Sequence, residues 1–205
     1  VTAAGGFEML VAQAVFAAEH FTGSTLDTDT LIPAVSRCLR HQLANVSLIG
    51  MPGCGKSTVG AALAKRLDKR FVDLDAEIER RTGHNIPDIF AEEGEEAFRR
   101  YEAAVLAEVA KGNSQVIACG GGVVKNPANS RALRQNGPVL WVRRPLSSLA
   151  TRGRPLSKGG EALRQMEAER TPLYTAAATA ELENNATLTE AVDKAVELFE
   201  ADETL

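Results

Sequence analysis

The chain has 205 residues, of which 44% are hydrophobic and 24% are charged, so it resembles an ordinary soluble protein with one core and a small appendage. Its net charge of −4 argues against a general nucleic-acid or membrane binder, because such proteins usually carry a basic field. Its three cysteines show no paired or metal-ligand spacing, and no apolar run reaches the ~18 residues that span a bilayer. These features predict a cytoplasmic protein without a signal peptide.

The first 42 residues predict only helices. Residues 7–21 have amphipathic helical spacing after two glycines, and residues 29–43 hold a second helical pattern. We therefore expect a helical extension, residues 1–43, before a second domain, residues 44–205. One interpretation of the extension is a docking hairpin for that domain.

From residue 45 onward, short apolar strands alternate with helices. The expected strands are 46–49, 70–75, 115–118, 139–142 and 180–182, and the expected helices start at 56 and 76, lie near 130 and at 161–170, and end with 188–200. Such alternation predicts an α/β fold, with a parallel sheet covered by helices on both faces.

A phosphate-binding loop lies between the first of these strands and the first helix. Residues 50–57 read GMPGCGKS and match the pattern G-x-x-x-x-G-K-[ST]. In such a loop the backbone N–H groups form an anion nest at the helix N-terminus. Lys56 is expected to reach the β- and γ-phosphates and the Ser57 hydroxyl to bind Mg²⁺, so the pattern predicts binding of a nucleoside triphosphate. The alternative is a glycine-rich turn with an unrelated lysine.

Two aspartates follow the second predicted strand, at the sheet edge where open α/β proteins bind ligands. Asp73 and Asp75 are two residues apart, which on a strand places them on one face. One could hold Mg²⁺ through water while the other accepts a hydrogen bond from a substrate hydroxyl. For Asp75 the alternative is an N-cap of the following helix.

Four further segments carry candidate ligand-binding groups. Arg99 and Glu102 have the i, i+3 spacing that orients a guanidinium toward an anion, although the segment alone favours a solvated charged face. Gly120-Gly121-Gly122 lets a ligand approach the backbone, or forms a hinge. Arg154 and Arg170 lie in two basic segments beside prolines, and the Gly-flanked segment of Arg154 suits a lid that closes over phosphates; surface arginines are the alternative.

Taken together, these segments resemble shikimate kinase. The motifs GMPGCGKST, FVDLD, IPDIFAEEGEEAFRRYE, GGG, RPL and ERTPLY occur in that order between residues 45 and 200. The resemblance implies a P-loop kinase fold with substrate-binding and lid segments. It also implies ATP- and Mg²⁺-dependent phosphorylation of the 3-hydroxyl of shikimate, a step of chorismate biosynthesis, by a monomeric kinase domain.

The resemblance assigns a role to each motif. Lys56, Asp75 and Arg154 would be catalytic, and Ser57, with Asp73 through water, would hold Mg²⁺. The ATP phosphates would be bound by the loop and the lid, through Gly53, Cys54, Gly55, Lys56, Ser57, Thr58 and Arg154. Shikimate would be bound by Asp75, Phe90, Phe98, Arg99, Gly120, Gly121, Gly122 and Arg170, with Glu102 steadying Arg99.

Two features depart from the family pattern. The lid segment is short, residues 151–160, and Asn184-Asn185 offers amides where relatives offer adenine a basic residue. The alternatives to shikimate kinase are a gluconate or nucleoside-monophosphate kinase, or a nucleotide-binding module that has lost turnover. Arg99 and Arg170 together with Asp75 favour shikimate.

The extension has a resemblance of its own. Residues 5–14 and 19–23 resemble the last helices of shikimate dehydrogenase, where the glutamine matching Gln13 touches the substrate. The dinucleotide-binding domain of that family is absent here, so Gln13 has no site to complete. The resemblance implies that the chain is the kinase portion of a dehydrogenase–kinase fusion.

Overall fold

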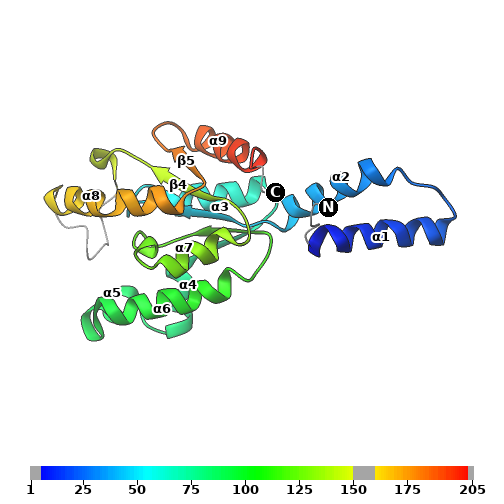
Figure 1. Ribbon diagram of the computed structural model, residues 1–205. Coiled ribbons are helices and arrows are strands. Elements are labelled where there is room, and N and C mark those ends of the chain that lie inside the picture. Colours follow the sequence, from blue (N-terminus) through cyan, green and yellow to red (C-terminus); the bar gives the residue numbers. More distant parts are fainter. Residues whose placement is uncertain (1–5, 150–159, 203–205) are drawn as a thin grey trace. The chain divides into compact units, whose positions relative to one another are not determined.

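The computed structural model describes residues 6–149 and 160–202, which form two compact units that divide between Leu43 and Ala44. The first unit is a helical hairpin of α1 (Gly6–Thr22) and α2 (Thr28–Leu43) (Figure 1). The two helices pack against each other, and an ion pair of 2.9 Å joins Arg40 Nη2 to Glu8 Oε1. Two helices are therefore present where the amphipathic spacing predicts them.

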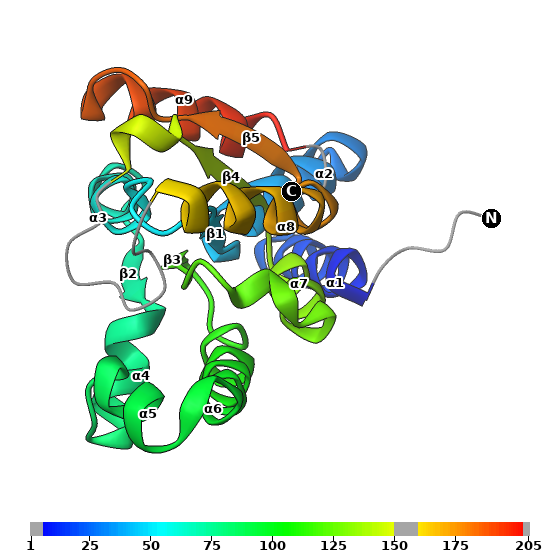
Figure 2. The same cartoon turned by 90° about the vertical axis from the view of Figure 1, so that its left-hand side faces the viewer.

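The second unit is built on a five-stranded parallel sheet in the order β2-β3-β1-β4-β5 (Figure 2). Its strands are β1 (Val46–Ile49), β2 (Arg70–Asp73), β3 (Gln115–Ala118), β4 (Val139–Arg143) and β5 (Ala180–Glu183). The central strand β1 is buried along its whole length, and its Leu48 pairs with Ala118 on one side and Leu140 on the other. Burial on both faces explains why this strand reads as a continuous apolar run.

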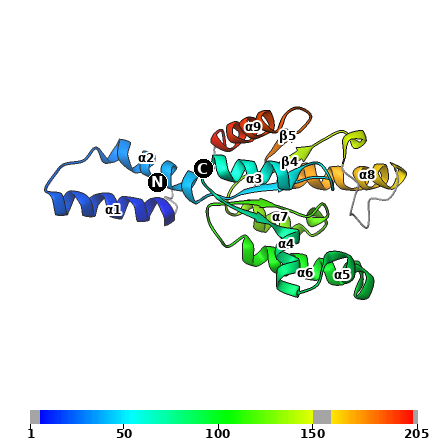
Figure 3. The ribbon, with the colours of Figure 1, turned by 180° about the vertical axis from the view of Figure 1, so that it is seen from behind.

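Helices cover both faces of this sheet. On one face α3 (Lys56–Arg66) packs beside α9 (Leu188–Glu200), as Figure 3 shows from behind. On the other face lie α7 (Pro127–Arg134), α8 (Gly160–Ala177) and the short 3₁₀ helix η1 (Val123–Lys125), while a second 3₁₀ helix, η2 (Leu146–Ser148), follows β4. The predicted α/β architecture is confirmed.

Three helices separate β2 from β3 and lie beyond that edge of the sheet (Figure 2). They are α4 (Leu74–Thr82), α5 (Ile86–Glu92) and α6 (Gly94–Val109). Gly83 ends α4 in the left-handed conformation, and the Asn85 side chain caps α5 by accepting the Asp88 N–H. Within the described ranges, no helix has the length and apolarity needed to cross a membrane.

The boundary between β2 and α4 differs from the prediction. The strand ends at Asp73, whose carboxylate accepts the N–H groups of Asp75 at 3.1 Å and Ala76 at 3.3 Å, so Asp73 is the N-cap of α4. The alternative that made Asp75 the cap is therefore wrong, as is the placement of both aspartates on one strand face. Asp75 lies instead in the first turn of the helix, because the helix begins two residues earlier than predicted.

Candidate active site

A cavity of about 440 Å³ opens at the carboxyl edge of the sheet, between the phosphate-binding loop and helices α5, α6 and α8. It brings together most of the predicted site residues. Those that line it are Gly53, Gly55, Lys56, Ser57, Thr58, Asp73, Asp75, Phe90, Phe98, Arg99, Gly120, Gly121, Gly122 and Arg170. Cys54 is fully buried behind the loop, and Arg154 lies outside the described residues.

The phosphate-binding loop has the conformation that an anion nest needs. Gly55 precedes α3 with φ of +98°, a region that side chains rarely tolerate, and Gly53 is also left-handed with φ of +84°. Lys56 is only 8% exposed, and its Nζ donates to the carbonyls of Gly50 and Met51, both at 2.9 Å. The positive end of α3 and the Lys56 ammonium therefore face the same cavity.

Asn184 supports this loop from the end of β5. Its Nδ2 donates to the Cys54 carbonyl at 2.7 Å, and a Cβ added to Gly55 would lie 2.5 Å from that nitrogen. Asn184 is buried, so its amide is used inside the protein and is not presented to a ligand. The sequence indicated only that Asn184 offers an amide where relatives offer adenine a basic residue, so this supporting role was not predicted.

The predicted metal ligands meet at the mouth of the loop. Ser57 Oγ donates to Asp73 Oδ2 at 2.6 Å, while Asp73 Oδ1 caps α4. Among the described residues no cluster of three or more His, Cys, Asp or Glu could hold a metal. One hydroxyl and one carboxylate fit Mg²⁺, which usually takes one or two protein oxygens and completes its shell with phosphate and water.

Two buried carboxylate oxygens face the glycine segment. Asp75 Oδ1 and Glu102 Oε1 have no hydrogen-bond partner within the described residues, and a Cβ on Gly120 would lie 2.8 Å and 2.9 Å from them. Burial raises the pKa of both carboxyl groups; nearby Asp73 adds to the effect at Asp75, while Arg99 opposes it at both. These distances leave room only for glycine at position 120.

Two arginines also line the cavity. Arg99 Nη1 donates to Glu102 Oε2 at 2.7 Å, and its guanidinium lies so close to Gly122 that a Cβ there would be 2.3 Å from Nη2. Arg170 is 3% exposed, and its Nε is buried without a partner among the described residues. Both guanidinium groups therefore line the cavity, and neither belongs to a solvated charged face.

Aromatic side chains shape the walls. The rings of Phe90 and Phe98 pack with centroids 4.9 Å apart and give the cavity an apolar side. Tyr174 is fully buried, stacks against Trp141 and donates its hydroxyl hydrogen to the Gly121 carbonyl. Burial raises the pKa of Tyr174, so the hydroxyl keeps its proton and fixes the glycine segment.

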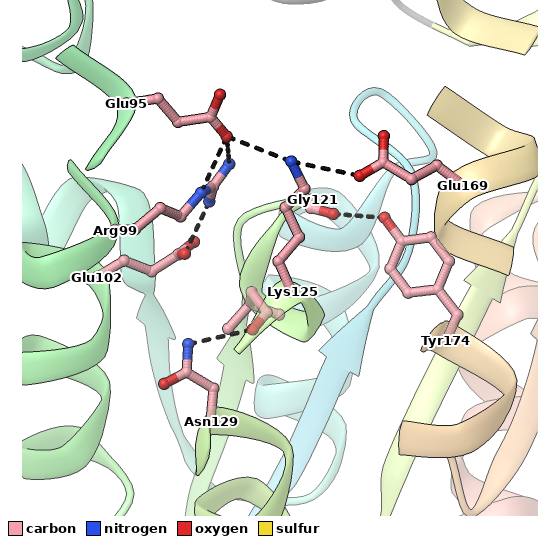
Figure 4. Close-up of polar contacts among 9 residues, drawn as sticks. Glu95, Arg99, Glu102, Gly121, Lys125, Asn129, Glu169 and Tyr174 are labelled. Atoms are coloured by element: carbon pink, nitrogen blue, oxygen red, sulfur yellow. Dashed lines mark hydrogen bonds and ion pairs between the residues drawn. The ribbon is translucent and has the colours of Figure 1, made fainter. Parts of the chain in front are cut away.

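The structure adds residues that the sequence did not single out (Figure 4). Lys125 Nζ lies 3.5 Å from Glu95 Oε1 and 3.4 Å from Glu169 Oε1. The i, i+4 spacing of Glu95 and Arg99 could have revealed their ion pair of 3.1 Å. Arg144 also lines the cavity and directly follows β4. Its position in the sequence could have indicated this, because the carboxyl ends of parallel strands meet at the edge of the sheet where ligands bind.

Comparison with known proteins places this site in a family. A family model described as shikimate kinase matches residues 52–200. The chain belongs to the shikimate kinase family. The helical hairpin lies outside the matched range.

Individual shikimate kinases agree with this family match. The chain is 44% identical to a shikimate kinase of Symbiobacterium thermophilum over 144 residues, which are 65% of this chain and 83% of that protein. It is 40% identical to one of Clostridium botulinum (strain Alaska E43) over 154 residues, 73% of this chain and 93% of that protein.

Solved structures of the family have the same fold. The shikimate kinase of Acinetobacter baumannii in complex with shikimate aligns with a TM-score of 0.76 and 34% identity, covering 82% of this chain and 99% of that chain. The enzyme of Aquifex aeolicus aligns with a TM-score of 0.67 and 30% identity, covering 75% of this chain and 94% of that chain. The chain is thus a kinase of this family, with ATP and Mg²⁺ as the expected cosubstrate and metal.

Proposed function

We propose that this chain transfers the γ-phosphoryl group of ATP to the 3-hydroxyl of shikimate, giving shikimate 3-phosphate and ADP. One observation carries the proposal: a cavity beside the phosphate-binding loop holds two cationic groups, Arg99 and Arg170, and an Asp75 oxygen that has no hydrogen-bond partner among the described residues. Shikimate has a carboxylate on one side of its ring and hydroxyls on the other, which suits that pair of environments. The shikimate complex of the A. baumannii relative supports this assignment.

The residues divide into a phosphate side and an acceptor side. On the phosphate side, Lys56 and the loop amides would hold the phosphates, while Ser57 and Asp73 would hold Mg²⁺. Bound Mg²⁺ would neutralise charge on the phosphate oxygens. Lys56 now bonds to loop carbonyls, and in this role it exchanges them for phosphate oxygens. Arg154, outside the described residues, stays the expected lid cation.

On the acceptor side, Arg99 and Arg170 would grip the carboxylate, because guanidinium groups match its geometry. Asp75 Oδ1 would accept a hydrogen bond from the 3-hydroxyl. A bond then forms between that hydroxyl oxygen and the γ-phosphorus, the bond from the γ-phosphorus to the bridging oxygen breaks, and the proton passes to Asp75. The raised pKa of Asp75 makes it a stronger base than an exposed aspartate.

The test is ADP release in the presence of shikimate, quinate, gluconate and nucleoside monophosphates. We expect the largest kcat/KM with shikimate, and a rise in the KM for shikimate but not for ATP in the Arg99→Lys variant, because lysine cannot make a bidentate contact. A larger kcat/KM with gluconate or a nucleoside monophosphate would overturn the substrate assignment. ATP binding without turnover of any acceptor would favour a nucleotide-binding module.

We further propose that residues 1–43 derive from the last helices of a shikimate dehydrogenase, and that residues 44–205 form a monomeric cytoplasmic kinase domain. The dehydrogenase-like motifs, the division between Leu43 and Ala44 and three unpaired cysteines support this. The gene provides the test: an initiation codon at Val1 with no dehydrogenase reading frame ahead of it would defeat the fusion, and sedimentation as a dimer would defeat the monomer.

A further inference from the structure

Three of the five N–H groups of Arg99 donate hydrogen bonds in the structure. Its Nη1 donates to Glu102 Oε2 at 2.7 Å. Its Nε and Nη2 both donate to a single oxygen, Glu95 Oε1, at 3.3 Å and 3.1 Å. The Nε–Nη2 edge is one that an arginine uses to bind a carboxylate with two parallel hydrogen bonds. Glu95 therefore occupies donors that an incoming carboxylate would need.

The two glutamates that hold Arg99 are not equivalent. The Glu102 side chain is 1% exposed, so it is a fixed part of the protein interior. The Glu95 side chain is 41% exposed and stands in the first turn of α6, at the rim of the site (Figure 4). Exposure lets Glu95 exchange one ion-pair partner for another at little cost, because solvent stabilises the carboxylate between partners.

A second cation is already in place for Glu95. The same Oε1 atom that accepts from Arg99 lies 3.5 Å from Lys125 Nζ, which also lies 3.4 Å from Glu169 Oε1 (Figure 4). Lys125 thus joins η1 to α6 and to α8, the helix that carries Arg170. Burial raises the pKa of Glu95, but hydrogen bonds and charge from Arg99 and Lys125 outweigh it, and the net shift is downward. Glu95 is therefore an anion at neutral pH.

We propose that Glu95 is an internal placeholder for the substrate carboxylate, and that Lys125 receives Glu95 when the substrate takes its place on Arg99. The inference rests on the proposed function, in which Arg99 grips the carboxylate. Glu95 and Lys125 are positioning residues here: Glu95 competes with shikimate for Arg99, and Lys125 weakens that competition by offering another partner. Neither acts on the phosphoryl group.

The experiment measures the Kd of shikimate by calorimetry, without nucleotide, for the wild type, Glu95→Gln, Lys125→Gln and the double variant. Half-exposed ion pairs are modest, so we expect shikimate to bind about threefold tighter to Glu95→Gln and about threefold weaker to Lys125→Gln. In the Glu95→Gln background, Lys125→Gln should change the Kd by less than about 1.5-fold, because Lys125 acts through Glu95. The KM for ATP should not change in any of them.

Glu96→Gln is the matched control. It removes the same charge from the next residue of α6, where the Glu96 side chain is 93% exposed and lies 3.6 Å from Arg100. Its Kd for shikimate should equal that of the wild type. If Glu96→Gln lowered the Kd of shikimate as much as Glu95→Gln does, the effect would come from net charge in general, and the proposal would be overturned.

Other results would also overturn it. Weaker binding by Glu95→Gln would mean that Glu95 orders Arg99 for the substrate. A Lys125→Gln effect that persists without Glu95 would mean that Lys125 acts on the substrate directly. If the wild type binds shikimate and the variants bind it with the same Kd, this inference is wrong and the proposed function is unaffected. A wild type that releases ADP with shikimate but does not bind it without nucleotide removes this inference alone. A wild type that neither binds shikimate nor releases ADP with it removes the proposed function, and this inference with it.

Discussion

Replacing Asp75 by Asn separates catalysis from stability at one residue. Asn keeps the size of the side chain and removes its charge, and the N-cap of α4 is untouched because Asp73 provides it. In the proposed reaction, Asp75 Oδ1 orients the acceptor hydroxyl and takes its proton. We expect kcat to fall at least about a hundredfold, or ~2.7 kcal/mol of barrier, which is within the range for loss of a general base.

The same change should not weaken the fold. Burial, and then the charge of Asp73, raise the pKa of Asp75, so the ionised carboxylate destabilises the folded state. That penalty is absent below the pKa of the unfolded chain, where the group is protonated in both states, and it develops as pH rises through the higher folded pKa. Relative to wild type, the Asp75→Asn variant should therefore gain melting temperature as the pH rises above about 4, the pKa of an unfolded aspartate.

Glu77→Gln is the matched control, another carboxylate-to-amide change on α4. Glu77 pairs with Arg80 at 2.7 Å and Arg81 at 2.6 Å, and the hydrogen bonds from these arginines lower its pKa. This variant should keep its kcat and should not gain melting temperature at pH 8. The assays are ADP release at saturating shikimate and thermal unfolding at several pH values. A near-normal kcat for Asp75→Asn would refute the base assignment, and a clear loss of melting temperature at pH 8 would refute the electrostatic argument.

Three further variants test separate parts of the site. Lys56→Ala should lower kcat by more than about tenfold, and a smaller loss, under ~1.4 kcal/mol, would exclude Lys56 from transition-state stabilisation. Gly120→Ala puts a Cβ 2.8 Å from Asp75 Oδ1, so kcat/KM for shikimate should fall by at least about tenfold; an unchanged value would show that the acceptor binds elsewhere. Asn184→Ala removes the 2.7 Å hydrogen bond to the Cys54 carbonyl, so the free energy of unfolding should fall by ~1 kcal/mol. The KM for ATP should rise, while the KM for shikimate, which serves as the internal control, should not change.

The regular elements could largely be predicted from local sequence. Strands β1 and β3 and helix α9 occupy the predicted residues, because short buried apolar runs and the Thr187 capping box mark their limits. The end of β2 could not be placed correctly. Asp73 and Asp75 have the same intrinsic capping preference, and the choice is set by pairing with β3, where Asp73 is opposite Ala118.

Chemical motifs predicted the candidate site better than they predicted its internal contacts. The loop lysine, the aspartates and the arginines could be named because each belongs to a short motif at a strand end or on a helix. The partners of Lys125 could not, because Glu95 is 30 residues away in sequence and only the packed fold joins them. Asn184 is 130 residues from Cys54, so its support of the phosphate-binding loop was equally hidden.

Among the described residues, the cavity atoms that lack a hydrogen-bond partner favour one orientation of the proposed acceptor. A buried polar atom without a hydrogen bond costs free energy, so the folded chain carries a penalty that a ligand can remove. Asp75 Oδ1 and Glu102 Oε1 are acceptors and repel an anion, while Arg170 Nε is a donor beside a positive charge. In the proposed function, an acceptor molecule with one anionic and one hydroxyl-bearing side would therefore place its anion toward Arg99 and Arg170. Its hydroxyls would then face Asp75 and the phosphate-binding loop, which is the orientation that the proposed phosphoryl transfer requires.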